Sequence, residues 1–143
     1  MSVDITTPVP QRNPRSFARR TWLATMFAAT VLPALLWLIV VSAGGHDLAA
    51  DVGGTVQHVD LAPVCVGAAV SASCGMGMAS WLRRFKHRRR IWWTVALIAL
   101  AGSLLSPLGG TTTITVVVLL SMHLIVGAVV IAGGLALPGP SQQ

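Results

Sequence analysis

The sequence predicts an all-α protein, a membrane-embedded bundle of four helices, and three observations support that prediction. First, 54% of the 143 residues are hydrophobic and only 10% are charged, whereas roughly 25% of the residues in a soluble domain are charged. Second, four apolar stretches are each long enough to cross a hydrocarbon core of about 30 Å. They lie at about residues 21–42, 60–82, 91–108 and 112–137. Third, all ten Lys and Arg residues lie outside these stretches, because charge inside a lipid-solvated helix is costly.

Residues 1–18 predict a disordered cytoplasmic tail, because they contain three Pro residues and no apolar periodicity. A four-span transmembrane domain is then predicted over 19–138, followed by a second cytoplasmic tail at 139–143. The first helix, at about 21–42, carries Pro33 near its middle, which removes one backbone hydrogen bond and predicts a kink. A cleaved signal peptide is the alternative, but its apolar core would span only about 7–15 residues, so we expect the helix to be retained.

The loop at 43–59 is the longest in the chain, and it leads into the second helix at about 60–82. We expect Asp60 to be the N-cap of that helix, with Pro63 in the first turn, where its missing N–H does no harm. Together with Asp60, this loop offers nitrogen and oxygen ligands of the kind that divalent metals use: His46, Asp47, Asp51 and His58. Their spacing matches no compact ligand motif, so we expect a solvated loop and no metal site.

Small side chains recur at every fourth position of the second helix. The stripe consists of Gly67, Ser71, Gly75 and Ala79. Such a stripe leaves a groove along one helix face, where the backbone of another helix can approach closely. The groove could be internal to the bundle or the face of a dimer. We expect it to be internal, which would make this helix central.

A basic loop separates the second helix from the third. Its charged side chains are Arg83, Arg84, Lys86, Arg88, Arg89 and Arg90. We expect them to contact anionic lipid headgroups at the inner leaflet, at about 1 kcal/mol per charge near the surface. The third helix, at about 91–108, opens with the interfacial pair Trp92 and Trp93. A tight turn at 106–111 then leads into the fourth helix at about 112–137.

The orientation follows from the positive-inside rule, which counts Lys and Arg near the membrane ends. With the N-terminus inside, four spans place all ten basic residues in the cytoplasm and predict that both chain ends are cytoplasmic. Nine of the ten are Arg, which suggests a high-GC bacterial genome and therefore a bacterial plasma membrane. The net charge of +6 is also found in nucleic-acid-binding proteins, but its clustering at helix ends predicts lipid contact and no nucleic acid.

His123 is the only ionisable side chain deep inside a predicted span. It lies about 11 residues, or roughly 16 Å, from the outer end of the fourth helix, near the membrane midplane. An ionisable residue at that depth is a functional hypothesis by default. The partners that we expect at this level are Ser71, Ser73, Cys74, Thr30 and the Ala29 carbonyl freed by Pro33. A neutral imidazole would then hold the bundle together, whereas a proton relay is the alternative. A bis-histidine haem would need a second deep His, so no cofactor is expected.

Several short motifs resemble a family of small four-helix membrane proteins of actinobacteria that is catalogued as a domain of unknown function. They are VDLA at 59–62, the basic inner loop, W-x-x-A at 93–96 before SLLSPL at 103–108, and MHLIVG at 122–127. The resemblance covers about residues 20–135. It implies a four-span topology with no assigned activity. It also makes Asp60 and His123, which fall in the VDLA and MHL stretches, the first residues to test.

No pattern in the chain supports hydrolytic or transfer chemistry, so we do not expect an enzyme. The leading hypothesis is a structural or accessory membrane subunit that binds another membrane protein or further copies of itself. The alternative is a small transporter or proton-linked carrier that uses His123 and Asp60. A polar, water-accessible cavity joining these two residues would favour transport.

Overall fold

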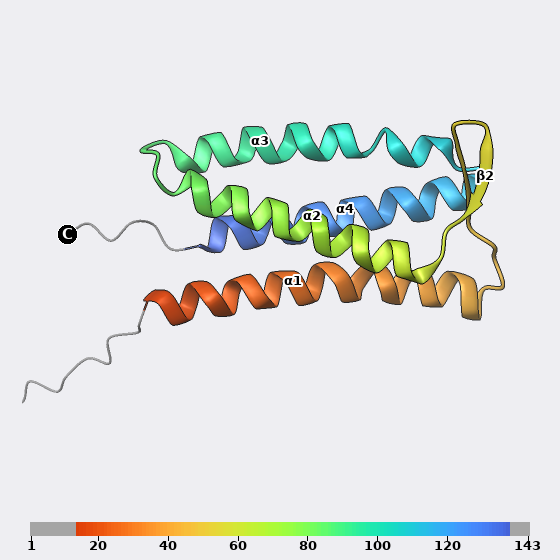
Figure 1. Ribbon diagram of the computed structural model, residues 1–143, viewed down its shortest axis with the longest axis horizontal. Helices are drawn as coiled ribbons and strands as arrows, with labels where there is room; N and C mark the ends of the chain where they lie inside the picture. Colours follow the sequence, from red (N-terminus) through yellow and green to blue (C-terminus); the bar gives the residue numbers. More distant parts are fainter. Residues whose placement is uncertain (1–13, 138–143) are drawn as a thin grey trace, which may run out of the picture.

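The computed structural model describes residues 14–137 and confirms the all-α bundle. Its four helices are α1 (Pro14–Leu38), α2 (Leu61–Leu82), α3 (Arg88–Ser103) and α4 (Thr113–Ala136). They lie side by side along one long axis, with both described chain ends and the α2–α3 loop at the same end (Figure 1). Each helical span is long and apolar enough to cross a membrane.

The helix α2 begins one residue later than predicted, and α4 is one residue shorter than predicted at each end. The first helix, α1, begins at Pro14, earlier than predicted. Residues 14–18, which we assigned to a disordered tail, are therefore helical. A Pro at the first helical position loses no hydrogen bond, because that N–H has no partner inside the helix. The remaining tail residues, 1–13 and 138–143, lie outside the described part of the chain. Beyond Leu38 the first span continues as a π-helix, η1 (Ile39–Ala43).

The third span is interrupted, which the prediction of one helix at 91–108 missed. Here α3 ends at Ser103, and a short 3₁₀-helix, η2 (Ser106–Gly109), completes the span. Pro107 is the cause, because it has no N–H to donate to the carbonyl of Ser103, and its ring would clash with that carbonyl in a continuous α-helix. The hydroxyl of Ser103 donates to the carbonyl of Leu100 at 2.8 Å at this break.

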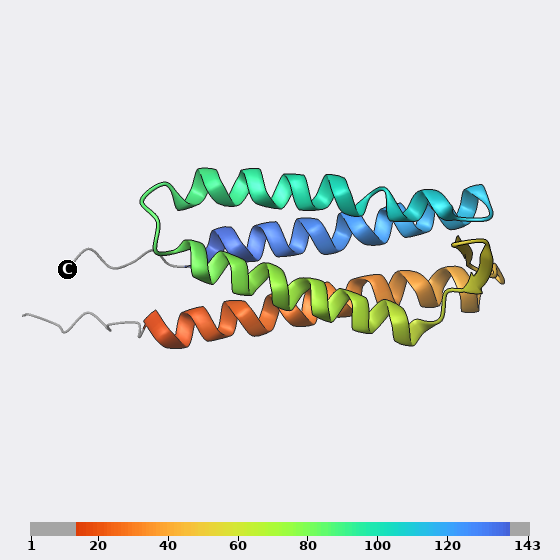
Figure 2. The ribbon, with the colours of Figure 1, turned by 45° about the horizontal axis from the view of Figure 1, so that its top comes forward.

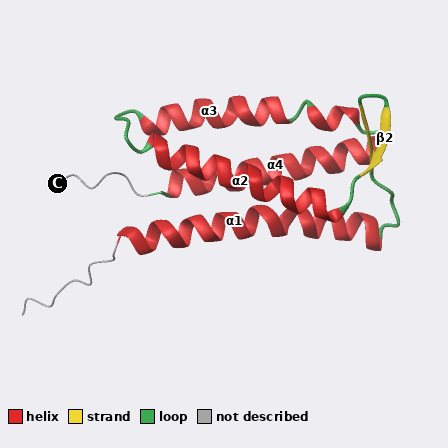
Figure 3. Ribbon diagram, in the orientation of Figure 1, coloured by secondary structure: helices red, strands yellow, loops and turns green. Residues whose placement is uncertain are grey.

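The long loop contains a β-hairpin that the sequence analysis did not predict (Figure 3). Strands β1 (Ala49–Val52) and β2 (Thr55–His58) pair antiparallel, with Ala49 opposite His58. The two-residue turn between them is Gly53–Gly54, with φ values of +64° and +84°. Paired left-handed residues suit the twist of a tight hairpin, and Gly adopts them without a Cβ penalty. A Gly pair between two short runs was therefore the missed signal.

The hairpin lies across the end of the bundle opposite the two described chain ends and is bonded to the α3–α4 turn. The backbone N–H and the hydroxyl of Thr111 both donate to the carbonyl of Ala49, at 3.1 and 2.9 Å. Just before β1, the fully buried Leu48 packs in a cluster with Val118 and Met122 of α4. These contacts join the α1–α2 connection to the α3–α4 connection.

Large apolar side chains cover the outside of the bundle. Phe27, Ile98 and Val66 are 71%, 68% and 62% exposed, respectively. The buried residues are mostly small or medium, such as Ala29, Ala72 and Met76. An outer surface of this kind needs lipid rather than water around it, so the structure is that of a multi-pass membrane protein.

Candidate functional site

His123 lies ten residues after the first residue of α4, about 15 Å along the helix axis. Its Nδ1 donates to the carbonyl of Leu119 in its own helix at 2.8 Å. A carbonyl oxygen only accepts, so Nδ1 carries a proton and Nε2 remains for any second partner. Further along α4, Gly127 packs against Leu100 of α3, and Val130 packs against Gly75 of α2. By helical periodicity the half-buried His123 therefore faces the space between α2 and α3.

The inter-helix partners that we predicted for His123 are wrong: its hydrogen-bond partner is Leu119 of its own helix, and two of the predicted groups also bond within their own helices. Thr30 donates to the carbonyl of Met26 at 3.0 Å, and Ser73 donates to that of Ala69 at 2.8 Å. In an apolar surrounding, a hydroxyl takes the nearest acceptor, which is the carbonyl four residues earlier. Among the described residues, the one hydrogen bond of a hydroxyl to another helix is that of Ser73 to the Met26 sulfur, at 3.5 Å.

Asp60 occupies the N-cap position of α2, as predicted, but its side chain makes no capping hydrogen bond and is exposed. It lies beside the hairpin, whereas His123 lies inside the fourth span. The structure does not bring the two side chains together in a hydrogen bond. Asp60 and His123 are therefore separate features rather than one site.

The polar side chains of the loop between α1 and α2 form one pair. The His58 Nδ1 lies 3.0 Å from the Asp47 carboxylate, with both side chains mostly exposed. Asp51 instead accepts from the backbone N–H of Gly54 at 2.8 Å and supports the hairpin turn. Over residues 14–137, no three His, Cys, Asp or Glu side chains gather as a group that could hold a metal ion.

The small-residue stripe of α2 divides into an inner and an outer half. Gly75 packs against Val130 of α4, and Ala79 is buried. Gly67 and Ser71 are exposed, and a Cβ on Gly67 would meet no atom within 4 Å. The prediction of internal packing therefore holds for Gly75 and Ala79 only.

The close approaches from all three other helices converge on α4, although we had expected α2 to be central. Gly133 lies against Thr25 of α1, and Gly134 lies against the indole of Trp92 in α3. Gly127 meets Leu100 of α3, as described above. Because these glycines have no side chains, α1 and α3 approach the α4 backbone closely, whereas at the α2 contact the glycine is Gly75 and the side chain is Val130 of α4.

At the basic end of the bundle, two side chains of α3 make hydrogen bonds to the backbone of α4 or its C-cap residue. Arg88 donates from Nη1 to the carbonyl of Leu137 at 3.1 Å, which caps the C-terminal end of α4. Trp92, which we placed at the lipid interface, is only 5% exposed and donates from Nε1 to the carbonyl of Ile131 at 3.2 Å. Its partner Trp93 is 40% exposed, as expected of an interfacial residue. Of the five other loop cations, Arg83 is half-buried, and the rest are exposed: Arg84, Lys86, Arg89 and Arg90.

A pocket of about 300 Å³ opens beside these arginines, between the ends of α2, α3 and α4. Arg88, Arg89 and Trp92 contribute from α3, and α2 and α4 supply a largely apolar wall. Sequence reasoning identified the arginines but not the pocket, because it placed Trp92 on the outside.

Almost all of the part of the chain that the structure describes belongs to a segment that matches a known protein family. The match covers residues 13–136, and the family is described as one of unknown function. This confirms that part of the predicted resemblance, while the actinobacterial origin stays a prediction. No curated protein and no solved structure matches the chain.

Proposed function

Because the chain belongs to this family of unknown function, DUF6069, we propose its role from its structure: a non-enzymatic accessory subunit of the bacterial plasma membrane that binds a transmembrane helix of another protein. The basic loop contacts the inner leaflet, and both chain ends are cytoplasmic. The actinobacterial origin and the plasma membrane belong to the same proposal.

Charge asymmetry along the bundle supports this orientation. Arg19, Arg20 and the basic loop lie at the end that also holds both described chain ends (Figure 1). The carboxylates of the described residues, Asp47, Asp51 and Asp60, belong to the hairpin region at the opposite end. Cytoplasmic loops carry the excess of Lys and Arg in bacterial membrane proteins.

The observation that carries the accessory role is the outward face of α2. This face has small exposed residues spaced three or four apart: Gly67, Ser71, Cys74 and Gly77. A Cβ built on Gly67 or on Gly77 would meet no atom within 4 Å, so both positions have open space in the isolated chain. Van der Waals packing against such grooves is a main source of helix association in lipid, where the hydrophobic effect contributes little.

Cross-linking through Cys74 tests this role. With the half-buried Cys65 replaced by Ala, Cys74 is the single thiol of the chain and lies on the proposed face. A short maleimide–benzophenone cross-linker, whose photoreactive arm inserts into C–H bonds, should join it in native membranes to a different membrane protein, which mass spectrometry identifies.

A pair of Gly→Leu variants, one on this face of α2 and one on α3, supplies the matched comparison. Gly77→Leu should reduce the cross-linked product several-fold, whereas Gly102→Leu should not, because Gly102 is an exposed glycine of α3 with equally open space. Cross-linking only to a second copy of the chain would refute the accessory role, and so would equal yields from the two Leu variants.

A further inference from the structure

The pocket at the basic end lies at the depth of a headgroup boundary. Its lining comes from the last turns of α2 and α4 and the first turn of α3: Ala79, Leu82, Arg88, Arg89, Trp92, Gly134 and Leu135. In Figures 1 and 2, α2 lies near α3 at this end and diverges from it toward the hairpin. The pocket is therefore bounded by three helix ends where the chain passes from the apolar spans to the basic loop.

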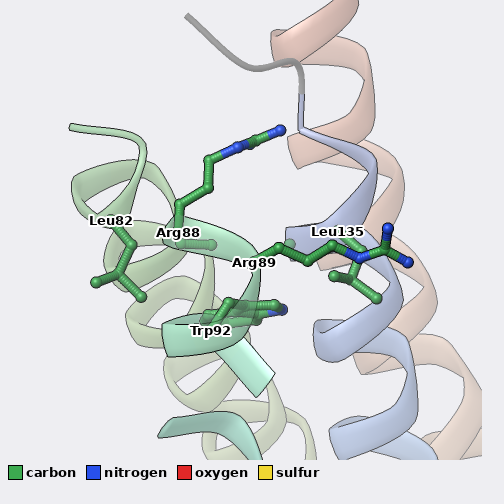
Figure 4. A pocket seen from close by; sticks show the side chains of 7 residues that line it. Leu82, Arg88, Arg89, Trp92 and Leu135 are labelled. Carbon is green, nitrogen blue, oxygen red and sulfur yellow. The ribbon is translucent and has the colours of Figure 1, made fainter. Parts of the chain in front are cut away.

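Trp92 gives the pocket a rigid floor. Its indole lies against Gly134, where a Cβ would collide with the ring, and its Nε1–H is bonded to the carbonyl of Ile131. Neither the ring nor the α4 backbone can move into the pocket without losing this bond. Leu82 and Leu135 supply apolar side chains on either side (Figure 4).

The rim carries two guanidinium groups. Arg88 uses Nη1 to hold the Leu137 carbonyl, which fixes its head at the edge of the pocket. Arg89 is exposed and extends from α3 toward α4 above Trp92 (Figure 4). An Arg has five N–H donors and no acceptor, so most of the donors of this pair are unused by the described residues.

No carboxylate in the lining balances this charge. The acidic residues that the structure describes lie between 47 and 60, at the opposite end of the bundle. The positive end of the α3 dipole adds to the potential, because Arg88 and Arg89 are its first residues. Within residues 14–137 no carboxylate lies at this end of the bundle, so the two guanidinium groups can receive an anionic ligand, and paired guanidinium groups match phosphate geometry.

From this geometry we infer that the pocket binds the phosphate of one anionic phospholipid, with the glycerol and upper acyl carbons against Leu82, Leu135 and the Trp92 ring. A volume of about 300 Å³ is at the lower end of the range for ligand pockets, about 300–1,000 Å³, and suits a headgroup rather than a whole lipid. The apolar walls favour an amphiphile over a free phosphate ion. The inference relies on the proposed function only for the leaflet, since binding itself does not depend on orientation.

Native mass spectrometry of the full chain in mild detergent tests the inference with phosphatidylglycerol and phosphatidylcholine. We expect one phosphatidylglycerol to stay bound per chain and phosphatidylcholine to be lost at much lower collision energy. Arg89→Gln should weaken phosphatidylglycerol about tenfold, because a hydrogen bond to a charged group contributes about 1.5–3 kcal/mol. This variant retains the Arg88–Leu137 bond, so the end of α4 should stay intact.

The matched control is Arg84→Gln, which removes the same charge from an exposed position of the same loop outside the pocket. Equal losses from the two variants would mean diffuse attraction and would overturn the inference. Equal retention of the two lipids would also overturn it. Displacement of the lipid by millimolar inorganic phosphate would reassign the pocket to a free ion. Because the protein is purified, these outcomes are independent of whether α2 binds a partner in the cell.

Discussion

Gly134 of α4 lies directly against the indole ring of Trp92 in α3, leaving no room for a Cβ between them. The same ring donates to Ile131, so the contact fixes both the spacing and the rotation of the two helices. Close packing of this kind substitutes in lipid for the hydrophobic effect that assembles soluble bundles.

Gly134→Ala should therefore destabilise the bundle. A methyl group at this position must displace Trp92 or shift α4, and such overpacking costs about 1–3 kcal/mol. Thermal unfolding in detergent, followed by circular dichroism, measures the change. Gly77→Ala is the matched control, since it adds the same methyl to a helix interior with open space around it. An unchanged midpoint for Gly134→Ala would show that the ring moves aside freely.

Arg88→Met should loosen the last turn of α4. The carbonyl of Leu137 would lose its arginine donor, and a bond worth about 1 kcal/mol corresponds to about fivefold faster amide exchange. Hydrogen exchange of peptides covering 131–137 measures the effect. Arg90→Met removes a charge from the same turn of α3 without touching this bond, and it should leave the exchange unchanged.

His123→Leu should be tolerated. The imidazole bonds only to the carbonyl of Leu119 in its own helix, so its loss leaves no partner group stranded in another helix. We expect the free energy of unfolding to change by less than about 1 kcal/mol, judged by yield and thermal midpoint. Thr25→Leu should instead be destabilising, because Thr25 is buried against Gly133. A proton-dependent flux in vesicles that His123→Leu abolished would favour the transporter alternative.

The hairpin turn should reject β-branched residues. Gly53 has a φ of +64°, and a residue with a Cβ pays about 1–2 kcal/mol in this region, less for Asn. Gly53→Val should therefore loosen the hairpin, while Gly53→Asn should preserve it. The exchange rate of the Thr111 amide reports the outcome, because that N–H is bonded to the carbonyl of Ala49.

Labelling of intact cells tests the proposed orientation. In a chain with both native cysteines replaced by Ala, Gln57→Cys should react with a membrane-impermeant maleimide, and Lys86→Cys should react only after lysis. Both side chains are exposed at opposite ends of the bundle, Gln57 in β2 and Lys86 in the α2–α3 loop. Labelling of Lys86→Cys in intact cells would reverse the topology.

The sequence was sufficient for features that depend on chain-local chemistry. Asp60 and Thr112 are the N-cap residues of α2 and α4, and the Arg run ends the second span abruptly. Those helices were therefore predicted almost to the residue. The prediction failed at Leu104 and Leu105, because the apolar run continues through the break between α3 and η2.

Features that depend on how the helices face one another were harder to predict from the sequence. The stripe from Gly67 to Ala79 follows a period of four, while a helix has about 3.6 residues per turn. The stripe therefore drifts around α2 and only its inner half reaches the bundle. Similarly, the inward rotation of Trp92 depends on Gly134, forty-two residues later, and no local pattern encodes that pairing.

The hydrogen bonds from Thr111 to Ala49 have a consequence for biogenesis. They join residues 62 positions apart, so they cannot form until the third span and Thr111 have emerged from the ribosome. The hairpin that follows the first span must therefore wait, unattached, until the turn before α4 arrives. Its attachment to that turn is a late event of assembly, and it marks a chain whose third span is already in place.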